Sequence, residues 1–476
     1  MNRAWALVAA TAIGLGCGGG GDGGDGPSGN VTFTGSVSGT TIVVYDAQGS
    51  RVASATPTGT PPNRVFSIVL PVGGTYVLFL VENEGTPNQR VFPLYADGSL
   101  TTNRITLGEP GTIDLGFVDT STGNAIPARN PLFANGVTGG GQSTVIPAPL
   151  TVDGTVFAQA DLVGRWALHS IAVTSMSAVW TRATLVVAQD GTAEFADLAA
   201  SIPAGPQPPV FLKLTPGGVV SLAGADSRGV MSRGKDLVAL VMNAAGIGQT
   251  LGFLQKVGTG ATRERLVGTW RFHQLKCIGA VDSSPGHGTW SRGSLVVGSD
   301  LRVSASPDSF ETSDLSRDSA AAHAAQLAVA SDGTVTSAGN ATFHGTLSLD
   351  GNLVVATASE QGELVLLVMQ RAGTGFASAD MVGTWSFRQL EYWPGTLGQF
   401  SHGKASIDSS MNATLVEVAP NPVADGPFAI AISGDGIVTL TGDSKFRGTL
   451  SPDKGLLIAT TSIPGEPTVK MVVLQR

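Results

Sequence analysis

The stretch Arg265-Leu266-Val267-Gly268-Thr269-Trp270 occurs in two further versions, Asp161-Leu162-Val163-Gly164-Arg165-Trp166 and Asp380-Met381-Val382-Gly383-Thr384-Trp385. The three tryptophans, at positions 166, 270 and 385, are 104 and 115 residues apart. Three more motifs follow in the same order in each repeat. The first is an aromatic residue two positions before a basic one: Trp180 to Arg182, Trp290 to Arg292 and Phe400 to His402. The second is a basic residue followed by glycine, in Arg228-Gly229, His344-Gly345 and Arg447-Gly448, and the third is glutamine followed by a basic residue, in Gln255-Lys256, Gln370-Arg371 and Gln475-Arg476. Such a long period predicts whole domains in tandem rather than solenoid units. We assign the repeats to residues 161–260, 261–375 and 376–476.

Turn residues divide the second repeat into eight short segments typical of strands: 269 to 276, 289 to 297, 301 to 305, 326 to 330, 334 to 337, 342 to 348, 352 to 358 and 363 to 370. Only Ser316 to Ala325 is predicted to be helical, because it is rich in alanine and poor in β-branched residues. Eight strands with short connections predict an up-and-down antiparallel barrel, whose closure leaves no exposed edge.

A six-bladed β-propeller is the alternative architecture. The phrase from Gly345 to Val354 resembles the turn between two strands of a propeller blade, and two blades per repeat would complete one ring. A barrel repeat would fold when expressed alone, whereas a third of a ring would not. The Gly-x-Trp at the start of each repeat resembles the first strand of lipocalin-like barrels, in which the Trp closes one end. The later acidic-aromatic turn and the C-terminal helix of that family do not occur in this sequence.

A separate domain is predicted over residues 31–119. Its short β-branched runs, bounded by Gly, Pro and Asn, predict a β-sandwich: Val31 to Val37, Thr41 to Tyr45, Val65 to Leu70, Thr75 to Val81 and Thr112 to Val118. The motifs Gly35 to Gly39, Ile42 to Gly49 and Phe66 to Tyr76 resemble the carboxypeptidase regulatory-like, or transthyretin-like, sandwich. That resemblance implies a non-catalytic spacer or adhesion module. Residues 120–160, rich in Pro and Gly, are predicted to form a linker.

The N-terminus predicts export. Asn2-Arg3 precedes an apolar run from Trp5 to Leu15, so residues 1–16 are predicted to be a signal peptide. Gly14-Leu15-Gly16-Cys17 resembles the lipobox of bacterial lipoproteins, although Gly14 replaces the usual aliphatic residue. The resemblance implies that Cys17 is acylated, and the alternative is an ordinary secretory signal near a chance cysteine. The glycine-rich residues 17–30 then form a tether. We expect a lipid-anchored protein of the bacterial cell envelope, at the outer membrane, with its face undetermined.

Composition excludes some classes of function. The formal net charge is -8 and only 13% of residues are charged, which argues against nucleic acid as a partner. With Cys17 acylated, Cys277 has no cysteine with which to form a disulfide or a zinc site. It lies in the apolar-rich stretch from Trp270 to Ile278, so we predict a buried, inert thiol rather than a nucleophile.

The histidines do not have the spacing of metal ligands. In the aligned repeats, Arg388 stands where His169 and His273 stand, Arg182 and Arg292 stand where His402 stands, and Arg228 and Arg447 stand where His344 stands. Arginine cannot replace a neutral imidazole ligand, so these positions require a hydrogen-bond donor. No metal and no cofactor is therefore predicted. Ser-x-x-Lys at Ser232, Ser401 and Ser451 is attributed to chance, because the partner motifs of serine acyltransferases are absent from the sequence.

The aromatic anchors fall into two sets. Trp166, Trp270 and Trp385 are predicted to pack in the core, because aromatic rings bury a large apolar area. Each aromatic residue of the second set lies two positions before a basic residue, so both side chains are on the same face of a strand. They would either line a ligand cavity or stack on each other. These candidate ligand-facing residues are Trp180, Arg182, Trp290, Arg292, Phe400 and His402.

We predict no catalytic residue and a non-enzymatic binding or structural module. Its expected partners are the membrane, through the N-terminal lipid, and an envelope polymer, a protein or a small apolar ligand. One alternative is a hydrolase of envelope polymers with a site between repeats, which requires a cleft with paired carboxylates or a histidine of perturbed pKa. Another is a carrier of lipids or small ligands inside the barrels.

Overall fold

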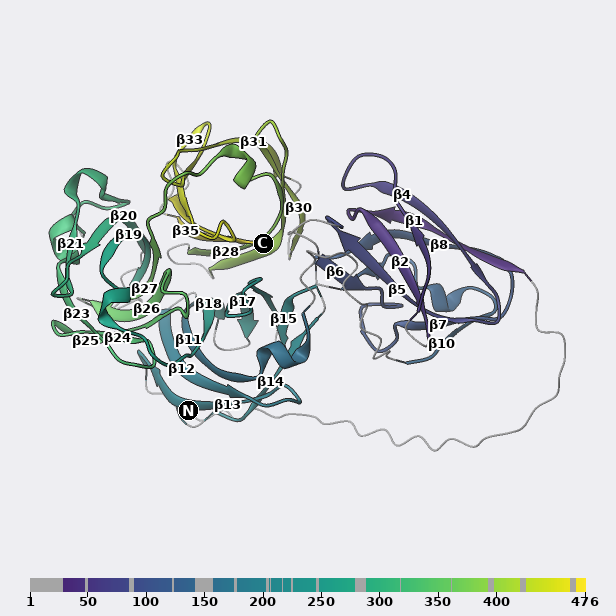
Figure 1. Cartoon of the computed structure of the whole chain (residues 1–476), viewed down its shortest axis with the longest axis horizontal. Coiled ribbons are helices and arrows are strands. Elements are labelled where there is room, and N and C mark those ends of the chain that lie inside the picture. Colours follow the sequence, from purple (N-terminus) through teal and green to yellow (C-terminus); the bar gives the residue numbers. More distant parts are fainter. Residues whose placement is uncertain are drawn as a thin grey trace.

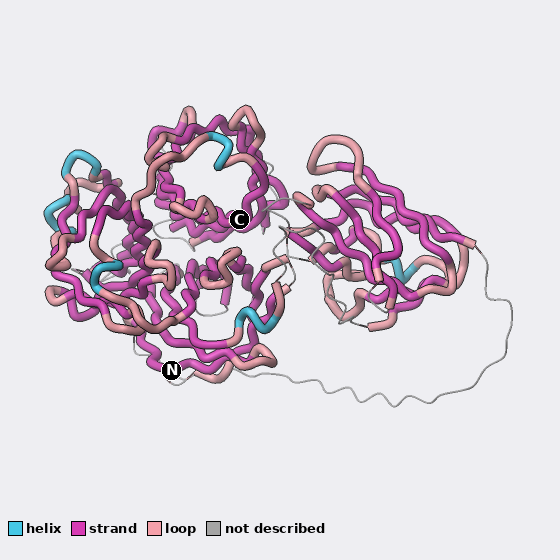
Figure 2. The backbone as a smooth tube through the Cα atoms, in the orientation of Figure 1, coloured by secondary structure: helices cyan, strands magenta, loops and turns pink. Residues whose placement is uncertain are grey.

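The computed structural model describes residues 29–476 except 48–49, 85–89, 122–123, 142–156, 175–177, 203–204, 206, 216, 224–225, 245–247, 279–287, 317, 361, 393–397, 420–424 and 463–467. The predicted signal peptide, the acylated Cys17 and nearly all of the tether therefore lie outside the described residues. The described chain is built of strands and short 3-10 helices, with no α-helix (Figure 2). None of the described helices is long and apolar enough to cross a membrane.

The N-terminal domain is a sandwich of two sheets (Figure 1). One sheet has the order β4-β1-β8-β9, with β1 Asn30–Val37, β4 Arg64–Pro71, β8 Gly111–Asp119 and β9 Ile126–Pro127. The other has the order β10-β7-β5-β2-β3, with β2 Thr41–Asp46, β3 Arg51–Ala55, β5 Thr75–Glu82, β7 Arg104–Leu107 and β10 Val137–Gly139, while β6 Arg90–Pro93 pairs with β5. Buried residues alternate along β1, so its inner face packs between the sheets.

The five strands predicted for this domain are present, but the predicted linker begins too early. Strands β9 and β10 lie within residues 120–160, and they pair with β8 and β7 respectively. Strand β3 was missed because its residues are mostly exposed and lack an apolar alternation.

Each repeat forms a closed antiparallel barrel of eight strands, as predicted, and the propeller alternative is wrong. Barrel 1 contains β11 Gly164–Val173, β12 Ala178–Val187, β13 Thr192–Ala200, β14 Val210–Leu214, β15 Val219–Leu222, β16 Asp226–Met231, β17 Leu237–Ala244 and β18 Gly248–Lys256. Barrel 2 contains β19 Gly268–Ile278, β20 Gly288–Val297, β21 Arg302–Ala305, β23 Ala325–Val329, β24 Thr334–Ser337, β25 Asn340–Leu347, β26 Leu353–Glu360 and β27 Glu363–Arg371. Barrel 3 contains β28 Gly383–Tyr392, β29 Gln399–Ile407, β30 Asn412–Ala419, β31 Asp425–Ile432, β32 Ile437–Leu440, β33 Asp443–Leu450, β34 Leu456–Ser462 and β35 Val469–Gln475.

Barrel 2 carries an insertion between β21 and β23. It contains the short strand β22 Glu311–Thr312, which pairs with β20, and two 3-10 helices, η4 Pro307–Ser309 and η5 Ala320–His323. The predicted helix from Ser316 to Ala325 is therefore wrong. Its alanines favour a helix, but Asp318 instead pairs with Lys276 and Ser291 of the barrel wall. These tertiary contacts outweigh a weak local preference.

The repeated Gly-x-Trp motif places one tryptophan in the core of each barrel. Trp166, Trp270 and Trp385 are fully buried, which confirms the core prediction, and each indole N–H donates to the carbonyl oxygen four residues earlier, at 2.6, 2.8 and 2.8 Å. The basic residue that ends the repeat, Lys256, Arg371 or Arg476, lies over the ring at 5.5, 4.7 or 4.1 Å from its centre. Gly268 has a φ of +136°, and a Cβ there would lie 2.8 Å from the Arg371 guanidinium, so this position requires glycine.

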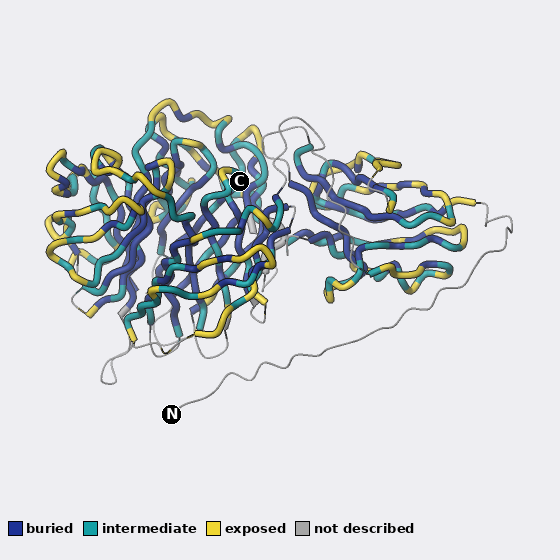
Figure 3. Tube along the Cα trace, turned by 60° about the horizontal axis from the view of Figure 1, so that its bottom comes forward, coloured by how far each residue is buried: buried dark blue, intermediate teal, exposed yellow. Residues whose placement is uncertain are grey.

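The three barrels form a closed ring (Figure 1). At each contact, the first two strands of one barrel pack on the last two strands of a neighbouring barrel. Thus β11 and β12 of barrel 1 pack on β26 and β27 of barrel 2. In the same way β19 and β20 pack on β34 and β35 of barrel 3, and β28 and β29 pack on β17 and β18 of barrel 1. One buried apolar cluster spans all three barrels and includes Ile171, Leu275, Leu390, Val355 and Ile458. We call it the shared core. Figure 3 shows buried strands where the barrels meet and exposed residues along their outer loops.

The sandwich is docked on the ring through buried charges. The Arg90 guanidinium donates to the carbonyl oxygens of Gly217 in barrel 1 and Gln475 in barrel 3, at 3.2 and 3.4 Å. The Lys404 ammonium of barrel 3 pairs with the Glu82 carboxylate of β5. Arg90, Lys404 and Glu82 are all at least nine-tenths buried, so these contacts hold the sandwich against barrels 1 and 3.

Candidate binding cavities and barrel interfaces

Barrel 1 encloses a cavity of about 530 Å³. Beyond Trp166 and Leu168, the inward side chains of β11 are the small Ser170 and Ala172, which leave room for a cavity in this part of the barrel. The wall is formed mainly by apolar side chains that are only partly buried, among them Leu168, Phe195, Leu198, Leu222 and Leu240. Apolar groups that remain half exposed inside a barrel provide a surface that an apolar ligand would cover.

Barrel 3 encloses a smaller cavity of about 340 Å³. Its wall is also mostly apolar and includes Leu415, Phe428, Ile430, Leu440 and Phe446. At the level of Ala172 in barrel 1, barrel 3 carries Glu391, whose carboxylate lies 3.0 Å from the Lys470 ammonium. Lys470 lines the cavity together with Gln389, Asp443, Thr461 and Ser462, so polar groups interrupt its apolar wall.

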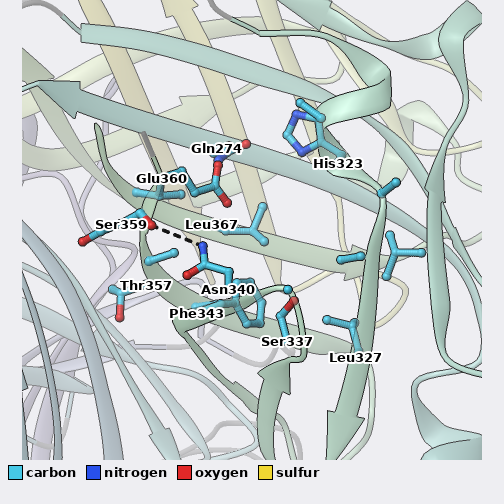
Figure 4. A pocket seen from close by; sticks show the side chains of 18 of the residues that line it. Gln274, His323, Leu327, Ser337, Asn340, Phe343, Thr357, Ser359, Glu360 and Leu367 are labelled. Atoms are coloured by element: carbon cyan, nitrogen blue, oxygen red, sulfur yellow. Dashed lines mark hydrogen bonds between the residues drawn. The ribbon is translucent and has the colours of Figure 1, made fainter. Parts of the chain in front are cut away.

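Barrel 2 encloses a cavity of about 510 Å³ with a different lining (Figure 4). Leu327, Phe343 and Leu367 form apolar parts of its wall, whereas Gln274, Lys276 and Glu363 contribute polar groups. Lys276 on β19 occupies the position that Ala172 has on β11 of barrel 1. This one inward position therefore accounts for much of the difference in polarity between the two cavities. Sequence reasoning missed this site, although the alternation Trp270, Phe272, Gln274, Lys276 would have placed both polar residues inside the barrel.

The buried Lys276 ammonium is surrounded by carboxylates. It lies 3.1 Å from Asp318, 3.5 Å from Glu360 and 3.7 Å from Glu363. Asp318 also lies 3.3 Å from the His323 imidazole. Burial raises the pKa of Asp318, but the hydrogen bond and charge of His323, with Ser291 and Lys276, outweigh this effect and hold the pKa well below its usual range. Asp318 is therefore ionised, and it ties the insertion to the barrel wall.

The six predicted ligand-facing residues lie on outer strand faces at the interfaces between barrels. The Arg182 guanidinium stacks on Trp180 at 5.4 Å, Arg292 stacks on Trp290 at 4.3 Å, and the rings of Phe400 and His402 are 6.0 Å apart. Stacking, one of the two arrangements expected, is thus present in all three pairs. Arg182 also lines a cavity of about 180 Å³ with His169 and His344, between barrels 1 and 2. A ligand-facing role for the six residues stays a prediction.

A basic triad recurs at each interface, formed by strands one and two of one barrel and strand six of the next. The triads are His169, Arg182 and His344; His273, Arg292 and Arg447; and Arg388, His402 and Arg228. His169 shares a hydrogen bond with Thr346 at 2.9 Å, and His273 shares one with Thr449 at 3.0 Å. In the third triad Arg388 donates to the Arg228 carbonyl at 3.1 Å, and Val230 replaces the threonine. The aligned basic positions therefore join neighbouring barrels.

Two of these interfaces differ in the charged residues that they contain, and in each the buried positive and negative charges change together. Between barrels 2 and 3, the Glu311 carboxylate of β22 accepts from Arg292 at 2.6 Å and also pairs with Arg447. Between barrels 1 and 2, the position of Arg447 holds His344, whose pKa is lowered by burial and by Arg182. The described part of barrel 1 has no strand equivalent to β22. One carboxylate and one arginine are thus absent together, which avoids an unpaired buried charge.

Burial keeps three of the histidines neutral. The pKa values of His169, His273 and His402 are each lowered to about 3, chiefly by burial and then by nearby cationic or imidazole groups. A base with so low a pKa is poorly matched to proton transfer near neutral pH. The predicted inert thiol, Cys277, is fully buried in the shared core, and burial raises its pKa. These three imidazoles and the thiol therefore pack between the barrels.

Acid is expected to destabilise the ring through these histidines. His273 has a pKa of about 3 when folded against an ordinary value of 6.5, so the unfolded chain binds more protons between these limits. The stability that depends on neutral His273 is complete above pH 6.5 and is lost as the pH falls toward 3. Between pH 7 and pH 5, His273→Gln should remove about 2 kcal/mol of the acid-induced loss. Urea unfolding of both proteins at the two pH values checks this; an equal loss in both would contradict it.

The fold and the cavities define a class: an all-β protein in which a sandwich is docked on a ring of three hollow barrels. No protein-family model matches the chain, and no curated protein matches it either. Among solved structures, a protein of unknown function of the DUF3598 family from Nostoc punctiforme aligns over 67% of this chain and 97% of its own, with 10% identity and a TM-score of 0.18.

Transferrin binding protein B is also among the similar structures. The protein from Neisseria meningitidis aligns over 65% of this chain and 75% of its own, with 8% identity and a TM-score of 0.21. A double mutant of the Haemophilus parasuis protein aligns over 65% and 74%, with 9% identity and a TM-score of 0.21. Similarities at this level carry no argument about the ligand or activity of this chain.

Proposed function

We propose that this chain is an envelope lipoprotein that binds a small apolar molecule inside barrel 1 without changing it chemically. The observation that carries the proposal is the 530 Å³ cavity walled by half-exposed apolar side chains. Its volume falls in the range of about 300 to 1,000 Å³ that small-molecule sites usually have. Anchoring through Cys17 would hold such a binding protein at the membrane, where apolar molecules are concentrated.

The chemistry of the described residues favours binding over hydrolysis. The histidines of lowered pKa lie between barrels, and they are too weakly basic to act near neutral pH. In barrel 1, the lining of the cavity contains no Asp, Glu, Lys, Arg or His among the described residues. An apolar ligand would bury the half-exposed wall there, and each square ångström covered would contribute about 25 cal/mol.

Filling the cavity tests the proposal. Ala200 lines the cavity on β13, so Ala200→Phe should occupy it and weaken binding of the neutral fluorescent probe N-phenyl-1-naphthylamine by about tenfold or more. Val186→Phe on the outer face of barrel 1, where Val186 is 43% exposed, is the matched control and should leave binding unchanged. The measurement is a fluorescence titration of the full chain carrying Cys17→Ser, which prevents acylation. Equal binding by both variants would refute a site in barrel 1.

A further inference from the structure

The interface between barrels 2 and 3 contains two sets of ion pairs. In the first, the Arg271 guanidinium of β19 lies 2.5 Å from the Asp435 carboxylate of barrel 3. In the second, the Glu311 carboxylate of β22 accepts from Arg292 at 2.6 Å and also pairs with Arg447 of barrel 3. All five of these charged side chains therefore have a partner of opposite sign within the chain.

The corresponding interface between barrels 1 and 2 lacks one member of each set. Ala167 stands at the position of Arg271, because each directly follows the tryptophan of its repeat. Ala199 lies opposite Arg182 in the register of β12 and β13, where Glu311 lies opposite the corresponding arginine of barrel 2. Two alanines thus replace one cation and one anion.

The two charged groups that remain line the same cavity. Asp332 corresponds to Asp435, since each precedes the glycine of the same turn, and with Arg182 it lines the cavity of about 180 Å³ between barrels 1 and 2. In the described part of the chain, no acidic side chain lies within ion-pair distance of Arg182, and no basic one lies that close to Asp332. A hydrogen bond from the Thr334 backbone N–H, at 2.9 Å, and the nearby charge of Arg165 lower the pKa of Asp332, so this carboxylate is ionised.

The cavity carries no net charge. Among the described residues of its wall there is one further cation, Arg165, and one further carboxylate, Asp197, and both are exposed. The pKa values of the two histidines in the wall are lowered chiefly by burial, so these imidazoles are neutral. Arg182 and Asp332 complete two charges of each sign. A ligand that suits such a site is neutral overall and carries one charge of each sign.

We propose that this cavity binds a small zwitterion, a molecule with one carboxylate and one ammonium group. The ligand carboxylate takes the place of the Glu311 carboxylate beside Arg182. It also accepts from the Nδ1 atom of His344, which is buried and has no partner among the described residues. The ligand ammonium takes the place of the Arg271 guanidinium beside Asp332. The cavity is smaller than the roughly 300 Å³ at which sites for drug-sized ligands begin, so the ligand has the size of an amino acid.

Calorimetric titration of the full chain carrying Cys17→Ser tests the proposal. The ligands are glycine, β-alanine and γ-aminobutyrate, which differ in the distance between their two charges. At least one of them should bind about tenfold or more tightly than both butyrate and butylamine, each of which carries a single charge. If none of the three binds, or if butyrate or butylamine binds equally well, the cavity is not a site for zwitterions.

Ala199→Glu supplies the missing carboxylate from the chain itself. Its side chain should pair with Arg182, as Glu311 pairs with Arg292, and so weaken the tightest of the three zwitterions by about tenfold or more. Ala188→Glu makes the same change at an exposed turn of the same hairpin and should leave binding unaltered. Equal affinities of the two variants for the zwitterion would refute the assigned place of its carboxylate.

A second variant tests the other end of the site and guards against loss of structure. Asp332→Asn should weaken the zwitterion by about tenfold and leave butyrate no weaker, because butyrate has no ammonium group. The control is Asp190→Asn, since Asp190 accepts the Thr192 backbone N–H at 2.8 Å in a similar turn outside the cavity. Unchanged zwitterion binding in Asp332→Asn would overturn the ammonium site. Neither Ala199→Glu nor Asp332→Asn should alter binding of the neutral probe in barrel 1, so the two proposals are tested independently.

Discussion

Ile458→Asp is expected to destabilise the whole ring by about 4 kcal/mol or more. Ile458 lies on β34, is fully buried, and belongs to the shared core rather than to the interior of barrel 3. The substitution removes a buried aliphatic side chain and places a carboxylate where apolar residues of three barrels meet. Because the shared core includes side chains of every barrel, all three barrels should lose stability together. Urea unfolding followed by tryptophan fluorescence measures the effect.

The control for this prediction is Val296→Asp on the outer wall of barrel 2. Val296 is 46% exposed, so the new carboxylate would stay in water and the loss should be within about 1 kcal/mol. Similar small losses for both variants would show that the barrels do not depend on the shared core.

Trp385→Ala is expected to cost about 3 to 5 kcal/mol. The Trp385 ring is fully buried, its indole N–H donates to the Met381 carbonyl at 2.8 Å, and the Arg476 guanidinium lies over it at 4.1 Å. Alanine would leave a large cavity in the core of barrel 3 and remove both contacts. Chemical denaturation monitored by far-UV circular dichroism checks the loss. Phe133→Ala, at a position 88% exposed, should change stability by less than about 0.5 kcal/mol, and an equal effect of the two substitutions would contradict the assigned role.

The sequence predicts the barrels well because each strand carries its own signal. In the second repeat every predicted strand is present, with ends shifted by at most three residues. The Gly-x-Trp anchor is predicted to be buried because its ring has a large apolar area, and the structure confirms that each ring packs in the core of its barrel. Local prediction fails for insertion residues such as Asp318, because the conformation there depends on an ion pair with Lys276, which lies 42 positions earlier in the sequence.

The ring of barrels was not predicted, although a signal for it is present. Strand β27 reads Glu363-Leu-Val-Leu-Leu-Val-Met-Gln-Arg371, apolar on both faces, which is typical of a strand covered on both sides. A barrel standing alone would need a polar outer face on this strand. Independent folding of one repeat, proposed to separate a barrel from a propeller, is therefore a poor criterion here: an excised barrel would expose its part of the shared core.

The candidate site was predicted only in part. Pairs of aromatic and basic residues on one strand face were identified, and they stack as one of the two expected arrangements. Their position between barrels could not be inferred, because it depends on which outer faces meet. The hollow interior of barrel 1 depends on small inward residues such as Ser170 and Ala172, whose significance emerges only when the inward face is known.

We propose above that barrel 1 binds an apolar molecule in its interior. The most direct measurement is a crystal structure of the Cys17→Ser chain soaked with 1-bromooctane, in which anomalous scattering locates the bromine atom. We expect a bromine peak inside barrel 1, among Leu168, Phe195 and Leu240, and the loss of that peak in Ala200→Phe. If barrel 1 contains no bromine and its apolar wall has collapsed into the cavity, barrel 1 is not a binding site for apolar molecules.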